Sequence, residues 1–156
     1  MQDRVELVIF DCDGVVIDSE VISARELIAH LCRYGVKVDF QYAMTHFLGR
    51  SFPTVRQHIE DNFSVQLPNK FEQEYRTNLL EAFQTQLKVT DGFSTMLAQL
   101  RCQYCIATSS SPIRVQGSLA QVGLTEQFNG HVFTASEVQH GKPAPDLFLH
   151  AAKQMG

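Results

Sequence analysis

Short runs of apolar, branched side chains recur along the chain, separated by stretches with helical periodicity. The first run, residues 6–10 (ELVIF), shows no polar alternation, which is typical of a strand covered on both faces of a parallel sheet. From about residue 87 onward, helical and strand patterns alternate with short links, which predicts right-handed βαβ units and an open parallel sheet. The elements expected there are a helix at 93–100, a strand at 103–108, a helix at 112–122, a strand at 131–134 and a helix at 145–155.

The stretch that follows the first strand has helical patterns only. Asp18 or Ser19 can cap a first helix, and Gly35 suits its C-terminal end. Further helices are expected at 40–47, 53–63 and 68–86. Because this stretch interrupts the strand–helix alternation, we expect an inserted helical domain at residues 16–87 and an α/β core made of residues 1–15 and 88–156.

The composition is that of an ordinary globular protein, with 44% hydrophobic and 19% charged residues. A formal net charge of −4 argues against nucleic acid or an anionic membrane surface as a partner, but not against small anionic substrates. No apolar run approaches the length of a membrane span, and no secretory signal is recognisable. Four scattered cysteines do not form a disulfide framework, so we expect a reducing, cytoplasmic location.

Two carboxylates, Asp11 and Asp13, directly follow the first predicted strand. Ligands of open α/β sheets bind beyond the carboxyl ends of the strands. Strand alternation would send the two side chains to opposite faces, but Gly14 allows a sharp turn that brings the second one back. One carboxylate can then attack phosphorus while the other protonates the leaving oxygen. An EF-hand calcium loop would have its glycine at position 6 between two helices, which does not match this segment.

The segment VIFDCDGVVIDSE, from Val8 to Glu20, resembles the first motif of the haloacid dehalogenase-like superfamily, in the subgroup with a helical cap inserted after the first strand. The resemblance extends over essentially the whole chain. It implies a Rossmann-like α/β core with an α-helical cap and a Mg²⁺-dependent phosphatase activity. It also implies that Asp11 forms an aspartyl-phosphate, that Asp13 is the acid and base, and that Mg²⁺ binds the Asp11 carboxylate and the Asp13 backbone carbonyl.

Two later segments resemble the second and third motifs of this family. CIATSSSP, residues 105–112, would hold phosphate through Thr108 and Ser109 at a strand-to-helix junction, although a TSSS run is also an ordinary helix-capping loop. HGKPAPDLF, residues 140–148, holds Lys142 in a rigid turn, and the resemblance implies that it keeps Asp11 ionised and offsets phosphoryl charge. A lone lysine is otherwise a solvated surface residue.

Residues 47–54, FLGRSFPT, resemble the cap loop that reaches the active site in helical-cap members. Gly49 would contribute to that turn, and Arg50 could bind a substrate carboxylate or second phosphate, with an ordinary linker arginine as the alternative. Within the family, Asp13 argues against dehalogenases and phosphonatases. A phosphatase of a small sugar or sugar-acid phosphate is therefore the leading expectation, and a β-phosphoglucomutase-like phosphomutase is the alternative.

The fourth acidic motif of the family, which supplies another metal-binding aspartate, is absent before Gly156. In the family sheet the next strand lies beside the first, so its absence would leave residues 6–10 as an exposed apolar edge. From this we expect a truncated form of a longer enzyme, with a non-catalytic fragment as the alternative. Cys102 and Cys105 lack the second pair of a zinc site, which favours core packing.

Overall fold

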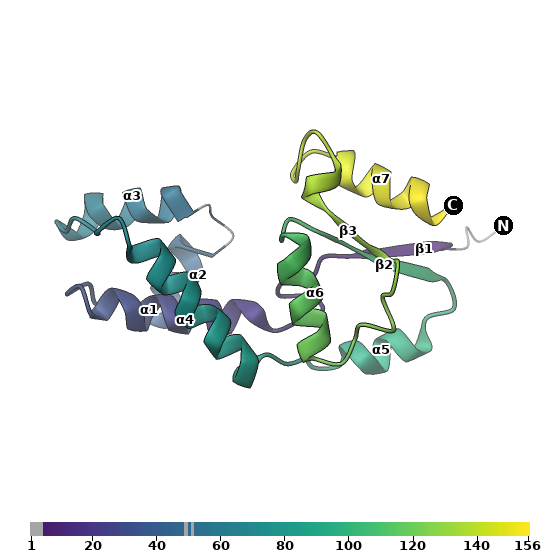
Figure 1. Ribbon diagram of the computed structural model, residues 1–156, viewed down its shortest axis with the longest axis horizontal. Coiled ribbons are helices and arrows are strands. Elements are labelled where there is room, and N and C mark those ends of the chain that lie inside the picture. The colour runs from purple at the N-terminus through teal and green to yellow at the C-terminus, as the bar shows by residue number, and fades with distance from the viewer. Residues whose placement is uncertain (1–4, 49, 51) are drawn as a thin grey trace. The chain divides into compact units, whose positions relative to one another are not determined.

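The structure, a computed structural model, describes residues 5–48, 50 and 52–156 (Figure 1). Strands β1 (Leu7–Phe10), β2 (Gln103–Thr108) and β3 (Val132–Thr134) form a parallel sheet in the order β1-β2-β3. In the register, Phe10 lies opposite Ile106, and Thr108 lies opposite Thr134. The predicted α/β class with an open parallel sheet is confirmed.

The chain divides into two compact units. The core unit comprises Met1–Asp18 and Leu87–Gly156, and the helical unit comprises Ser19–Gln86. The sequence placed the first boundary at residue 16, but Val16 accepts a hydrogen bond from Thr90 N (3.0 Å) and Asp18 N donates one to Lys88 O (3.0 Å). These backbone bonds fix residues 16–18 to the core unit, so the boundary lies three residues later than expected.

Helices cover both faces of the sheet in the core unit. Helix α7 (Asp146–Met155) lies on one face, where Leu147 and Ala151 pack against Cys105 and Ala107 of β2. Helices α5 (Phe93–Gln99) and α6 (Pro112–Gln121) lie on the other side of the sheet (Figure 1). A short 3₁₀ helix, η1 (Ala135–Glu137), follows β3. Central β2 is buried from Cys105 to Thr108, whereas β1 is only half-buried because it lies at the edge of the sheet.

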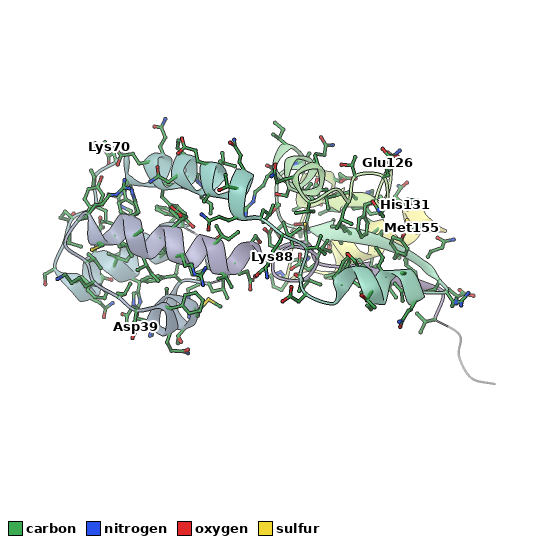
Figure 2. The ribbon with its side chains drawn as sticks, turned by 90° about the horizontal axis from the view of Figure 1, so that it is seen from below. Asp39, Lys70, Lys88, Glu126, His131 and Met155 are labelled. Carbon is green, nitrogen blue, oxygen red and sulfur yellow. The ribbon has the colours of Figure 1, made fainter. Side chains whose placement is uncertain are left out.

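The helical unit contains α1 (Ser19–Cys32), α2 (Phe40–His46), α3 (Phe52–Phe63) and α4 (Phe71–Gln86). Figure 2 labels Asp39, whose carboxylate caps α2 by accepting a hydrogen bond from Tyr42 N (2.7 Å). It also labels Lys70, which forms an ion pair with Glu74 (2.8 Å) at the start of α4. The helix predicted at 68–86 begins at Phe71, because Phe71 N bonds to Pro68 O in a turn.

The helical unit has an apolar core of its own, formed by side chains from all four of these helices. Leu31 of α1 is fully buried in it, whereas Leu80, on α4, is 55% exposed. We expect Leu31→Ala to lower the free energy of unfolding by about 2–5 kcal/mol, because it removes buried methyl groups and leaves a cavity. Leu80→Ala is the matched control and should stay within about 0.5 kcal/mol of the wild type. Urea denaturation of both variants checks the difference, and equal costs would show that the assignment of this core is wrong.

His30 is a buried titratable side chain of the helical unit, with its ring centroid 4.5 Å from that of Phe71. Burial, with a smaller contribution from the Arg33 charge, lowers the pKa of His30 below its ordinary value. The unfolded chain therefore takes up the proton at higher pH than the folded chain does. The free energy of unfolding should fall as the pH is lowered through the ordinary histidine range near about 6.5, until the lower folded-state pKa is passed.

The variant His30→Gln tests this pH dependence. Its free energy of unfolding should depend less steeply on pH than that of the wild type between about pH 7.5 and 5.5, since it lacks the buried imidazole. His131→Gln, at an exposed histidine of the core unit, is the matched control. Urea titrations at several pH values measure the slopes, and an unchanged slope in His30→Gln would contradict the expectation.

Candidate active site

The predicted catalytic residues lie at the carboxyl edge of the sheet, within the core unit. The pairing of Phe10 with Ile106 places Asp11 beside the end of β2, which is Thr108. Lys142 comes from the segment between η1 and α7. Three stretches far apart in the sequence therefore contribute to one edge, as the rule for open α/β sheets leads one to expect.

Lys142 is paired directly with Asp11. Its ammonium Nζ donates to Asp11 Oδ1 at 2.9 Å and to the backbone carbonyl of Ala107 at 2.8 Å. The Asp11 carboxylate also accepts a bond from Cys12 N (2.8 Å), and the Phe148 ring lies 5.2 Å from Nζ. Lys142 is 20% exposed and Asp11 is 47% exposed. The contacts leave the carboxylate accessible while they hold a positive charge against it.

Asp13 makes contacts that the sequence analysis did not predict. Ser110 Oγ donates to Asp13 Oδ2 at 2.6 Å, and Arg114 Nη2 donates to Asp13 Oδ1 at 3.1 Å. The backbone turns sharply behind it, with Gly14 at a φ of 75° and Gly14 N bonded to Ile17 O (2.8 Å). The TSSS run had marked the segment that contains Ser110 as a candidate binding loop, but not its contact with Asp13. Nothing local marked Arg114, which lies in the first turn of α6.

The proposed phosphate-binding residues form the junction between β2 and α6. Thr108 is buried, and its hydroxyl accepts a hydrogen bond from Ser110 N at 3.1 Å. Ser109 is exposed. Ser111 caps α6 by accepting a bond from Arg114 N (3.4 Å), so the capping alternative for this run also holds. Helix N-termini and hydroxyls at such junctions suit anions.

The sequence analysis predicted two substrate contacts in the helical unit, Gly49 and Arg50. Gly49 lies outside the described residues. Arg50 has an exposed side chain, and its backbone N donates to Phe47 O at 3.2 Å in the turn after α2. Both the substrate role and the ordinary linker role of Arg50 are compatible with this exposure.

The segment that contains Lys142 forms hydrogen bonds to the end of β3 and to α7. Glu137 accepts hydrogen bonds from Thr134 N (2.6 Å) and from His150 Nε2 (3.2 Å). Burial raises the pKa of Glu137, but the hydrogen bonds from Thr134 and His150 outweigh it, and the net shift is downward. His140 Nδ1 lies 3.1 Å from Asp146 Oδ2. Sequence reasoning missed these contacts, which flank Lys142 on both sides along the chain.

Cysteine chemistry has little part in this site. Cys12 lies between the two aspartates but is 1% exposed, and burial, with the charges of Asp13 and Asp11, raises the pKa of its thiol to about 12. A neutral buried thiol is a poor nucleophile. Burial also raises the pKa of Cys105, a residue of the sheet core, to about 11. Both Cys102 and Cys105 are free thiols; the predicted core packing holds for Cys105, which is buried, whereas Cys102 is only partly buried.

A magnesium site would draw on few protein ligands here. In the part of the chain that the structure describes, no three His, Cys, Asp or Glu side chains gather in a way that could hold a metal ion. Asp11 and Asp13 supply hard oxygen atoms at one edge of the sheet. Mg²⁺ is commonly bound by one or two carboxylates together with substrate phosphate oxygens, so this donor set fits it in kind.

Comparison with known proteins decides the family. A family model described as haloacid dehalogenase-like hydrolase matches residues 5–156. The chain belongs to the haloacid dehalogenase-like hydrolases. The predicted membership is thereby confirmed, and the chain is assigned to a family of enzymes. No helix within the described residues is both long and apolar enough to cross a membrane.

Several known proteins resemble the chain over nearly its whole length. The 6-phosphogluconate phosphatase of Escherichia coli is 28% identical over 153 residues, which cover 97% of this chain and 69% of that protein. The fructose-1-phosphate phosphatase of the same species is 31% identical, with coverage of 100% and 83%. A conserved haloacid dehalogenase-like protein of unknown function from Agrobacterium tumefaciens superposes with a TM-score of 0.92 at 31% identity, covering 98% of this chain and 70% of that one.

Proposed function

We propose that this protein is a Mg²⁺-dependent phosphatase that hydrolyses a small phosphorylated sugar or sugar acid through an aspartyl-phosphate on Asp11. The observation that carries the proposal is the salt bridge between Lys142 Nζ and Asp11 Oδ1, at 2.9 Å. A carboxylate at the end of a sheet strand, nearly half exposed and held by an ammonium group, is equipped to act as an anionic nucleophile. The similar phosphatases of Escherichia coli support the choice of substrate class.

In the first half of the reaction, Asp11 attacks phosphorus and the P–O bond to the leaving group breaks. Lys142 offsets charge on Asp11 and on the phosphoryl oxygens, because its ammonium contacts the nucleophile directly. The Thr108 hydroxyl, with Ser109 and the amides at the start of α6, would hold the phosphoryl group. Asp13 begins the cycle as the carboxylic acid, gives its proton to the leaving oxygen and becomes the carboxylate.

In the second half, Asp13 takes a proton from water, which attacks the phosphoryl group and regenerates the Asp11 carboxylate. Asp11 and the backbone carbonyl of Asp13 would hold the Mg²⁺. When bound, the metal supplies Lewis-acid neutralisation of the phosphate oxygens, which an anionic nucleophile requires. Gly49 and Arg50 are the proposed substrate contacts of the helical unit, which we interpret as the cap.

We further propose a cytoplasmic location and no nucleic-acid or membrane partner. The net charge of −4 supports the absence of an anionic polymer as a partner.

Phosphate release from a panel of phosphate esters tests the function. We expect the protein to hydrolyse 6-phosphogluconate or fructose 1-phosphate with added MgCl₂ and to lose this activity in EDTA. Little hydrolysis, with phosphoryl transfer between sugar positions when a sugar bisphosphate is added, would instead establish a phosphomutase. No turnover under any of these conditions would indicate a non-catalytic chain.

A further inference from the structure

We infer that Arg114 and Ser110 are positioning residues, which hold the Asp13 side chain in the orientation from which it gives a proton to the leaving oxygen and then, as the carboxylate, takes one from water. The inference rests on the proposed phosphatase function. It concerns two residues of the core unit to which the sequence analysis assigned no role.

Each oxygen of the Asp13 carboxylate has its own donor. Ser110 Oγ lies 2.6 Å from Oδ2, and Arg114 Nη2 lies 3.1 Å from Oδ1. A carboxylate bound through one oxygen can still rotate about its side-chain bonds, whereas donors on both oxygens fix its plane. The site is half-buried, with Arg114 32% and Asp13 27% exposed, so water competes less for these bonds than it would at an open surface.

The two donors are themselves held in place. Ser110 N donates to the hydroxyl of Thr108, which is 1% exposed at the end of β2. Arg114 lies in the first turn of α6, and its backbone N donates to Ser111 Oγ at 3.4 Å. Both donors thus come from one strand-to-helix junction. Through these two side chains the junction binds both carboxylate oxygens of Asp13, which lies about a hundred residues earlier in the chain.

Orientation matters for Asp13 because general acid catalysis depends on geometry and typically contributes about 10²–10⁴-fold. The alkoxide of a sugar hydroxyl is a strong base and leaves poorly without a proton. The p-nitrophenolate ion is a weak base and leaves without one. A misplaced Asp13 should therefore slow the hydrolysis of an alkyl phosphate much more than that of p-nitrophenyl phosphate.

The experiment compares fructose 1-phosphate or 6-phosphogluconate, whichever the wild type hydrolyses faster, with p-nitrophenyl phosphate. In the intact protein we expect Arg114→Gln to lower kcat for the alkyl phosphate by about 10–100-fold, with KM changed by less than about threefold. For p-nitrophenyl phosphate, kcat should fall by less than about threefold. Arg114→Lys should restore part of the loss, and Ser110→Ala should show the same selectivity. Arg101→Gln and Ser94→Ala, at exposed positions of the core unit, are the matched controls.

A merely structural role predicts a different pattern, in which both substrates lose activity to the same extent. Equal losses, or no loss on the alkyl phosphate, would overturn the positioning role. Ser110→Ala removes a single oxygen, so it provides an independent reading if Arg114→Gln does not fold. A wild-type protein that releases phosphate from neither substrate would overturn the proposed function instead, and with it this role.

Discussion

Asp11→Asn is expected to abolish the release of phosphate, with kcat reduced by at least about 10³-fold. The amide has almost the same size as the carboxylate and still offers an oxygen to Lys142 Nζ, which now lies 2.9 Å from Oδ1. It cannot act as the anionic nucleophile that forms the aspartyl-phosphate. The fold should therefore persist while the chemistry is lost. Phosphate release under saturating substrate and MgCl₂ measures the effect.

Asp91→Asn is the matched control for this variant. Asp91 is exposed in the same unit, where its carboxylate lies 3.4 Å from Lys88 Nζ, and its loss should leave activity unchanged. Mass spectrometry of the quenched wild-type reaction should find a phosphoryl group on the peptide that contains Asp11. Full Mg²⁺-dependent activity in Asp11→Asn would show that another residue is the nucleophile.

The second large effect is expected for Lys142→Met, which should lower kcat by about 10²–10³-fold. Methionine keeps much of the apolar stem but removes the charge that contacts Asp11 Oδ1 and the Ala107 carbonyl. The developing charge on the phosphoryl oxygens then loses the cation that contacts the nucleophile. Steady-state kinetics with the substrate found in the panel measure the loss.

Lys142→Arg should not restore full activity, because the planar guanidinium cannot reproduce a compact ammonium that bonds to two oxygens in a confined place. Lys153→Met, at an exposed position of α7, is the matched control and should behave as the wild type. A loss of less than about threefold in Lys142→Met would contradict a role for Lys142 in the chemistry.

The local pattern of the sequence determined the elements and the class of fold. The apolar run at residues 6–10, the strand at Gln103–Thr108 and the helices around them were predicted within three residues of their observed ends. Helix and strand periodicity depends on neighbours only a few positions away, so it can be read without the tertiary structure. The same reasoning placed Asp11 and Thr108 at one edge of the sheet, because parallel strands end together.

The contacts between the side chains of the candidate site were decided by the tertiary structure. Lys142 and Asp11 are 131 positions apart, and Arg114 and Asp13 are 101 positions apart, so no local pattern encodes either contact. The motif resemblance indicated the first pair. The second followed only from the packing of α6 beside the turn at Gly14.

The boundary of the helical unit is a similar example. It was misplaced by three residues, because the backbone bonds of Val16 and Asp18 to the segment at 88–90 depend on where two distant stretches meet. The half-burial of β1 likewise depends on the strand order and not on its apolar sequence. The sequence by itself thus determined which elements form and which strand ends carry the candidate site residues. The pairing of distant side chains was decided by the folded chain, since such contacts form only when the sheet and its helices are assembled.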